Sequence, residues 1–247
     1  MKKLLRGILV TAFWLLVWQG GAMLVGKAVL LPGPLSVLKA LLALSGTWGF
    51  WVSAANSVLK VMAGLLLGVA AGVLAAAGTA RFSALRSLLS PVMSAIKATP
   101  VASFIILALV WFRVGFIPVF TSFLIVFPMI WANVEQGIGG TDPALLEMAH
   151  AFRMPRGNLL AKIYVPSVKP YFLAAVNAGM GMAWKAGIAA EVICSAQSSI
   201  GGALHDAKIY LETENLFAWT FTVILLSIAL EKLFFRLAEW EGGRRDA

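Results

Sequence analysis

Charged side chains and cysteines are scarce in this sequence, and each shortage excludes a class of protein. Only 13% of the 247 residues are charged, whereas 60% are hydrophobic. That apolar content exceeds what the core of a soluble domain can bury, so we predict a polytopic membrane protein. The single cysteine, Cys194, excludes an intrachain disulfide and a cysteine metal cluster. The two histidines, His150 and His205, lie too far apart in sequence for a paired metal motif.

Two further sequence features are missing. The formal net charge is +9, yet no basic cluster alternates with stacking aromatic residues, so we expect no nucleic-acid partner. The basic residues are better explained as anchors of cytoplasmic loops. The sequence has no G-x-x-x-x-G-K-[ST] loop, so it is not expected to bind a nucleotide in that way. We therefore expect no catalytic residue, cofactor or metal in this chain.

Six apolar stretches predict an all-α protein with about six transmembrane helices. The first follows a basic N-terminus and resembles a signal peptide, but it is too long and lacks a cleavage site, so we expect it to be retained. The prolines of Leu31–Pro34 are expected to end it, and residues 35–51 to lie at the membrane interface. The predicted spans cover about residues 8–31, 52–78, 98–112, 116–136, 170–193 and 216–235.

The third and fourth predicted spans are irregular. The third has about 15 residues, which cover roughly 22 Å of a ~30 Å hydrocarbon core. It must therefore borrow flanking residues, thin the bilayer or be re-entrant. Pro118 and Pro128 are expected to interrupt the fourth. If the two form one re-entrant pair, the sidedness of all later segments is unchanged.

Small residues recur at every fourth position in two spans. Such rows let the backbone of another helix approach closely. In the second span, the row favours packing inside the protein over a dimer seam. In the fifth span, it predicts close packing against a neighbouring helix or a symmetry mate. The rows are Gly64, Gly68, Gly72 and Ala76, and Ala175, Gly179, Ala183 and Gly187.

Lysine and arginine are unevenly divided between alternate connecting segments. By the positive-inside rule, the richer set of segments faces the cytoplasm, and both termini lie inside. The segment 137–169 would then face the compartment that contains ATP. Residues 1–7, 79–97, 137–169 and 236–247 hold thirteen basic residues, and residues 32–51, 113–115 and 194–215 hold three.

One of the predicted cytoplasmic segments contains an amphipathic stretch from Glu147 to Pro166. Apolar residues recur there at spacings of three and four between basic and polar side chains. This pattern predicts one or two short amphipathic helices. A loop that only connects two spans does not need such a pattern.

The same stretch carries a motif formed by Glu147, Met148, Ala149, Arg153, Ile163, Val165 and Pro166. Its spacing resembles the E-A-A, three residues, G, nine residues, I-x-L-P motif of permease subunits of binding-protein-dependent ABC importers. Three letters differ. Met148 stands for alanine, Val165 for leucine and Arg153 for glycine.

The resemblance extends along nearly the whole chain. Short matching sequences occur at Leu31–Pro34, Asn56-Ser57, Ser90-Pro91, Thr99–Ala102, Ala183-Trp184, Ala190-Glu191 and Ile200-Gly201. Together they are similar to the nitrate/sulfonate/taurine-type branch of these permeases.

The resemblance implies the type I ABC importer permease fold in a single transmembrane domain over residues 1–247. It implies a homodimer that lies in the bacterial inner membrane and contacts membrane lipid. Its other implied partners are two cytoplasmic ABC ATPases, which bind ATP and magnesium, and an external or periplasmic binding protein. The solute would be a small organic or inorganic anion, such as a sulfonate or a nitrate-like compound. A coupling loop at about residues 138–169 would contact the ATPase. Its implied contact residues are Glu147, Ala149, Phe152, Arg153, Arg156, Gly157, Ile163 and Pro166.

Arg153 occupies the position where the motif has glycine. A glycine there implies a backbone conformation that costs other residues about 1 kcal/mol or more. Two alternatives follow. Either Pro155 and Gly157 move the break along the chain, with Gly157 as the permissive residue, or Arg153 has an ordinary right-handed conformation and adds a charge that faces the ATPase.

Polar and ionisable residues inside the spans are candidates for the translocation pathway, since burial in hydrocarbon is costly. Glu191, near the outer end of the fifth span, is either a gate or pathway residue or a structural hydrogen-bond partner. Lys185, nearer the middle of that span, either attracts an anionic substrate or pairs with another helix. Weaker candidates are Asn177, Asn133 and Glu135.

The alternative class is a secondary transporter or channel that works alone. It is disfavoured because the charged loop is amphipathic and no proton-relay or ion-site cluster stands out. A non-transporting membrane scaffold is a third class, and it predicts no substrate-dependent stimulation of an ATPase.

Overall fold

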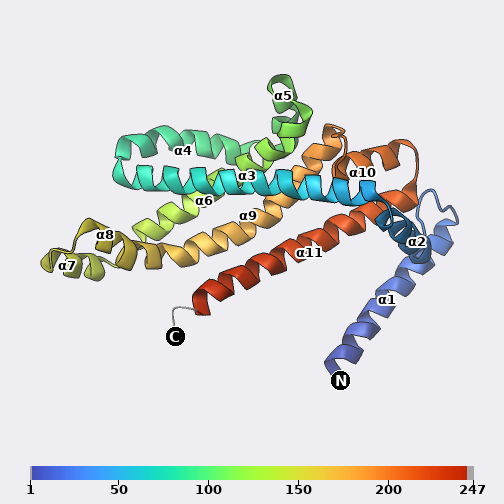
Figure 1. Cartoon of the computed structure of the whole chain (residues 1–247), viewed down its shortest axis with the longest axis horizontal. Coiled ribbons are helices and arrows are strands. Elements are labelled where there is room, and N and C mark those ends of the chain that lie inside the picture. The colour runs from blue at the N-terminus through green and yellow to red at the C-terminus, as the bar shows by residue number, and fades with distance from the viewer. Residues whose placement is uncertain (1, 244–247) are drawn as a thin grey trace. The chain divides into compact units, whose positions relative to one another are not determined.

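The computed structural model describes residues 2–243, with side chains at 5–234 and 236, and this part of the chain contains helices and no strand (Figure 1). The all-α prediction is confirmed. A 3₁₀ turn, Val114–Phe116, precedes α6, and a π-helical turn, Leu160–Tyr164, joins α8 to α9. The helices are α1 (Lys2–Val25), α2 (Pro34–Ser45), α3 (Trp48–Arg81), α4 (Ser83–Ala98), α5 (Val101–Trp111), α6 (Ile117–Gly139), α7 (Pro143–Ala151), α8 (Arg156–Leu159), α9 (Val165–Ile193), α10 (Ile200–Ile209) and α11 (Thr213–Gly243).

Within the described residues, five helical stretches are long and apolar enough to cross a membrane, and a sixth crossing results if α4 and α5 are counted as one span. This agrees with a multi-pass membrane protein. Neither α4, with 16 residues, nor α5, with 11, reaches the length of about 20 residues that a full crossing needs. The two helices are bent by 108° at the break between them. By length and composition, the two helices together form either a broken span or a re-entrant loop.

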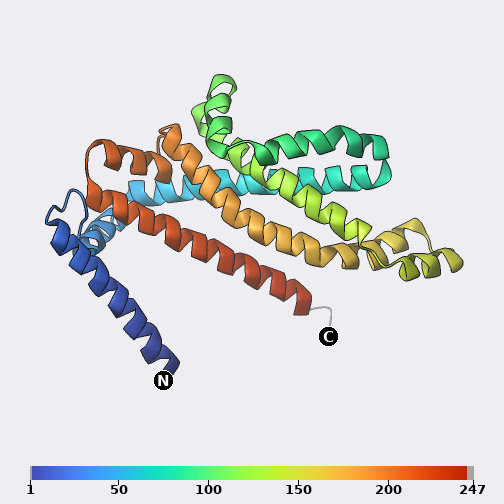
Figure 2. The same cartoon turned by 180° about the vertical axis from the view of Figure 1, so that it is seen from behind.

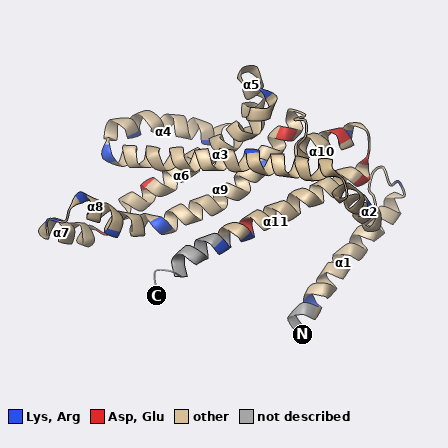
Figure 3. Ribbon diagram, viewed as in Figure 1, with Lys and Arg blue, Asp and Glu red and all other residues tan. Residues whose placement is uncertain are grey.

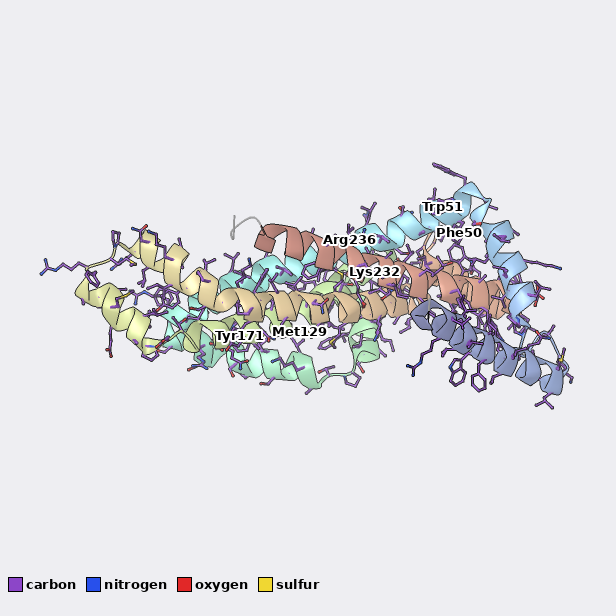
Figure 4. All side chains as sticks on the ribbon, turned by 90° about the horizontal axis from the view of Figure 1, so that it is seen from below. Phe50, Trp51, Met129, Tyr171, Lys232 and Arg236 are labelled. Atoms are coloured by element: carbon purple, nitrogen blue, oxygen red, sulfur yellow. The ribbon has the colours of Figure 1, made fainter. Side chains whose placement is uncertain are left out.

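The chain divides into two compact units, which we describe separately. Unit 1 consists of Met1–Ser57 and Glu191–Leu226, and unit 2 of Val58–Ala190 and Ser227–Ala247. In unit 1, aromatic rings join the first and last helices. The ring of Trp18 stacks on Phe217 and Phe221, with centroids 6.0 and 5.8 Å apart. Phe50 stacks on Trp219 at 4.8 Å, and Figure 4 labels Phe50 beside the exposed Trp51.

In unit 2, the glycine row of α3 packs directly against α6. A Cβ added at Gly68 would lie 2.8 Å from Cβ of Val126, and one added at Gly72 would lie 2.7 Å from Cβ of Ile130. A Cβ at Gly64 would overlap the carbonyl oxygen of Val119. These separations are shorter than side chains tolerate, so only glycine permits this approach. The prediction that the second-span row packs inside the protein is confirmed.

The small-residue row of α9 contacts the same two helices. A Cβ at Gly187 would meet Cγ2 of Val61 in α3 and would lie 2.8 Å from Oγ of Ser122 in α6. Ser122 donates a hydrogen bond of 3.1 Å to the carbonyl oxygen of Ala183. The prediction of a close neighbour for the fifth span is therefore confirmed, and that neighbour belongs to the same chain. Figures 1 and 2 show α3, α6 and α9 from opposite sides.

Several predicted boundaries are wrong. The first helix ends at Val25 and not at Leu31–Pro34, because Gly26 adopts a left-handed conformation with φ +65°. Pro118 lies in the first turn of α6, where the helix needs no amide donor, and α6 continues through Pro128 without interruption. The predicted outer segment 194–215 contains a helix, α10, that the sequence analysis did not predict.

We predict that Gly64→Ala separates α3 from α6 and lowers the thermal stability of the protein. The added methyl group would overlap backbone atoms of α6, which cannot rotate away. We expect a loss of about 1–3 kcal/mol, measured as the unfolding midpoint in detergent. Gly49→Ala in the same helix is the matched control, because nothing lies within 4 Å of the added Cβ. Equal midpoints for the two variants would contradict the packing.

Candidate functional site

The predicted amphipathic segment forms two short helices at one end of unit 2. Asp142 caps α7 by accepting a hydrogen bond of 2.9 Å from the amide of Ala144. Ala149 is buried, whereas Glu147 is exposed. The apolar Phe152 has 79% of its surface exposed. The segment thus presents an acid and a large apolar side chain to its surroundings.

Arg153 adopts a left-handed conformation, with φ 47°. The amide of Arg153 donates to the carbonyl of His150 at 3.0 Å, and the amide of Met154 donates to that of Ala149 at 2.9 Å. This pair of bonds is a Schellman motif, in which the residue after the cap must be left-handed. Both alternatives proposed from the sequence are wrong. The break does not move to Gly157, which lies within α8, and Arg153 is not right-handed.

The second half of the segment continues directly into α9. The helix of Arg156–Leu159 passes through the π-helical turn Leu160–Tyr164 and then through Pro166 into the long span. Ile163 is buried, whereas Arg156, Gly157 and Pro166 are exposed. A displacement of the exposed end would therefore act on α9 without an intervening loop. In unit 2, basic residues are seen around α7 and α8 and at the connection from α3 to α4 (Figure 3).

Glu191 is fully buried and is the residue at which the second segment of unit 1 begins. Its Oε2 atom accepts a bond of 2.7 Å from the hydroxyl of Ser57 and one of 3.1 Å from the amide of Gly201. The hydroxyl oxygen of Ser57 in turn accepts a bond of 2.9 Å from the amide of Ile200. The carboxylate therefore ties α3 to the N-terminus of α10, where negative charge is favourable.

These contacts support the structural alternative for Glu191. The sequence did not predict Ser57, 134 positions away, as its partner. The only signal was that both residues lie in short sequences shared with the resembled branch, Asn56-Ser57 and Ala190-Glu191. A role of Glu191 in the translocation pathway stays a prediction.

The other pathway candidates occupy different surroundings. Lys185 is exposed on α9, and Asn177 is half-buried on the same helix. Glu135 of α6 forms an ion pair with Arg86 of α4, with 3.1 Å between Oε1 and Nε. Asn133 donates a bond of 2.9 Å to the carbonyl of Met129, one turn earlier in α6.

Two cavities lie along the α4 side of α6 in unit 2. The first, of about 360 Å³, opens at the break between α4 and α5, and we call it the break cavity. Its polar lining residues are Lys97, Thr99, Thr121 and Asn133. The second, of about 480 Å³, is lined by Arg86 and Glu135 among others. Ala132 lines both, and Figure 4 labels Met129 from the first and Tyr171 from the second.

Of the predicted pathway residues, Asn133 lines the break cavity and Glu135 the second one, whereas Lys185, Asn177 and Glu191 line neither. Lys97 was not predicted as a pathway residue, because residues 79–97 were expected to form a connecting segment. The sequence of α4 did contain a signal for Lys97. Arg86 and Lys97 are eleven residues apart, which is about three helical turns, so they share one face of an amphipathic helix.

The apolar spans define the protein as a multi-pass membrane protein. The chain belongs to the family described as the binding-protein-dependent transport system inner membrane component, whose profile matches residues 68–241. Members of this family are transport subunits and not enzymes. Membership implies an ABC ATPase and a substrate-binding protein as partners.

Two relatives agree with this assignment, and one solved structure shares the fold. The chain is 24% identical over 235 residues to the taurine transport system permease TauC of Escherichia coli, covering 91% of this chain and 85% of TauC. It is 28% identical over 247 residues to the putative aliphatic sulfonates transport permease SsuC of Bacillus subtilis, covering 95% and 85%. The fold matches a crystallised amino acid ABC transporter with a TM-score of 0.63 at 16% identity, covering 79% of this chain and 94% of that one.

We predict that Ser57→Ala destabilises the protein because it removes the donor to Glu191 and the acceptor of the Ile200 amide at once. Buried groups that lose a partner cost about 1–3 kcal/mol each. The unfolding midpoint of the purified protein measures the loss. Ser53→Ala, about one turn earlier in α3, is the matched control and should change the midpoint far less. A Ser57→Ala protein as stable as the wild type would contradict a stabilising role of the Ser57 hydrogen bonds to Glu191 and Ile200.

Arg153→Gly should stabilise the protein by about 1 kcal/mol, because glycine adopts the left-handed conformation without a steric penalty. Thermal unfolding checks this, and the midpoint should rise by ~2–4 °C. Arg153→Ala is the control. It removes the same charge but keeps the penalty, so its midpoint should stay near that of the wild type. If both variants rise equally, the charge of Arg153 and not its backbone is the source of the cost.

Proposed function

We propose that this protein is the membrane-spanning subunit of an ATP-driven importer and that its 147–166 segment docks on the ATPase. The observation that carries the proposal is the exposed surface of α7 and α8. There Glu147, Arg153 and Arg156 are exposed, and so is the apolar Phe152. A short helix with an apolar contact and a few charges is suited to a groove on a partner.

The contacts within the segment suit it to transmit force. The Schellman motif fixes the end of α7, and the buried Ala149 and Ile163 hold its inner side. The exposed end then leads into α9 with no flexible linker. In the proposed mechanism, ATP binding closes two ATPase subunits, their grooves draw the docked segments together, and the spans rock from inward-facing to outward-facing. ATP and magnesium are bound by the ATPase and not by this chain.

We propose a homodimer whose two units per chain work as one permease domain over residues 1–247. The charge distribution supports an orientation with both termini in the cytoplasm. Lys97 lies at a helix break, so twelve basic residues remain on the proposed inner side against three on the outer. Arg244 and Arg245, which belong to this count, lie outside the described residues. In unit 1, acidic residues are seen on α10 and the following turn (Figure 3).

The solute is proposed to be a small anion delivered by an external binding protein, with the bacterial inner membrane as the site of transport. The family description and the names of TauC and SsuC support this proposal. The overall positive charge of the chain is compatible with an anionic cargo.

We predict that Glu147→Arg uncouples transport from ATP hydrolysis. The reversed charge would face the ATPase groove at the position where the permease presents an acid. The experiment uses vesicles that contain the full transporter, with taurine as the probe solute and the binding protein present. We expect ATP-driven uptake to fall at least tenfold while the permease remains in the membrane.

Glu214→Arg is the matched control, since Glu214 is also exposed but begins α11 in unit 1. It should retain uptake. Wild-type uptake by the Glu147→Arg transporter would overturn the coupling assignment. Uptake driven by an ion gradient without ATP would instead favour a secondary transporter.

A further inference from the structure

The break cavity has the composition of a small-molecule site. Its volume of about 360 Å³ lies in the range of known ligand pockets, which are mostly apolar with a few polar groups. Phe104, Met129 and Met182 contribute to its apolar wall. Among the described residues that line it, Lys97 is the one that carries a charge.

The remaining polar side chains of the cavity already use hydrogen-bond donors on nearby carbonyls. Thr99 donates to Ala95 at 2.8 Å, and Thr121 donates to Ile117 at 2.8 Å. No acidic side chain in the described part of the chain forms an ion pair with Lys97. The ammonium group of Lys97 is therefore the strongest donor that the cavity can offer to a ligand.

The helix break adds a second favourable feature. Val101, the first residue of α5, lines the cavity, and the N-cap Pro100 provides no side-chain hydrogen bond to the first turn of α5. Broken membrane helices commonly present such free N-terminal amides to anionic groups. The cavity thus combines a cation with the positive end of a helix.

A second cation lies further along the same face of α4. Arg86 lines the adjoining cavity and is paired there with Glu135. Its distance from Lys97 along the helix is roughly 16 Å, from eleven residues at ~1.5 Å each. The pairing leaves Lys97 as the cation of α4 without an acidic partner among the described residues.

We propose that the break cavity is an anion-binding site on the translocation pathway and that Lys97 is its specificity-determining residue. The ligand is a small organic anion whose charged group lies against the Lys97 ammonium and whose apolar part contacts Met129 and Phe104. This inference rests on the proposed function, because it assigns a pathway site within the importer. Lys97 replaces Lys185 as the residue expected to attract the anion: both lysines are exposed, but Lys185 does not line the cavity.

Thiol labelling tests the site without knowledge of the natural solute. Met129→Cys places a thiol in the cavity, in a Cys194→Ala background that leaves it as the sole cysteine of the chain. The full chain in lipid nanodiscs is treated with two probes, an anionic sulfonatoethyl methanethiosulfonate and a cationic trimethylammonioethyl methanethiosulfonate. Each rate is divided by the rate of the same reagent with free cysteine. We expect the anionic probe to be favoured about fivefold or more.

Adding Lys97→Gln should abolish that preference, and adding Lys97→Arg should retain it. Lys185→Gln is the matched control and should leave the ratio unchanged. Ile125→Cys, which also lines the cavity, is a second reporter in case Met129→Cys does not fold. An unchanged ratio in Lys97→Gln, or no reaction of either reporter with either probe, would overturn the proposal.

The labelling ratio and ATP-driven uptake are read separately. If the protein that keeps Lys97 shows no preference for the anionic probe, yet the transporter still imports taurine with ATP, the anion site alone is overturned. An intact preference in a protein that neither binds an ATPase nor imports with ATP would overturn the proposed function alone.

Discussion

The close approach of α3 and α9 to α6 is the constraint on which unit 2 depends. Lipid offers helices no hydrophobic driving force to associate, so their contact relies on tight packing and hydrogen bonds. Ser122 stands at the centre of this contact. It lies against Gly64 and Gly187 and donates to the carbonyl of Ala183. With this face of α6 occupied, Met129 and Asn133 line the cavity beside α4.

The fold also places backbone strain where function is proposed. Arg153 is held left-handed by two hydrogen bonds of the Schellman motif, although glycine would adopt that conformation at lower cost. The arginine thereby adds a cation to the exposed surface of the α7–α8 segment. Arg153 therefore both ends α7 and adds a positive charge. The protein is less stable than it would be with glycine at this position.

The break between α4 and α5 shows how a polar residue can be kept near the hydrocarbon region. A continuous helix would bury all its backbone groups in internal bonds, whereas a broken one frees amides beside a cavity. Thr99 and Pro100 stop α4, because the residue before a proline disfavours the helical conformation. Lys97 stands next to that stop and lines the cavity.

Local patterns were sufficient to predict much of this protein. Apolar runs set the number of spans to within the ambiguity of α4 and α5, and the small residues spaced by four predicted the glycine contacts of α3. The motif around Glu147 and its neighbours predicted the family. These features depend on residues that lie close together in the sequence, because helix periodicity repeats every few residues.

Contacts between distant segments were decided only by the tertiary structure. No local pattern pairs Ser57 with Glu191, since their bond depends on how α3, α9 and α10 meet. The left-handed Arg153 could not be inferred either, because an arginine favours the right-handed region unless surrounding bonds override it. The position of Lys97 at a cavity could not be predicted either, because the cavity is formed by the packing of α4 against α6. The sequence determined which faces are apolar or small, and the packing decided which partner each face would meet.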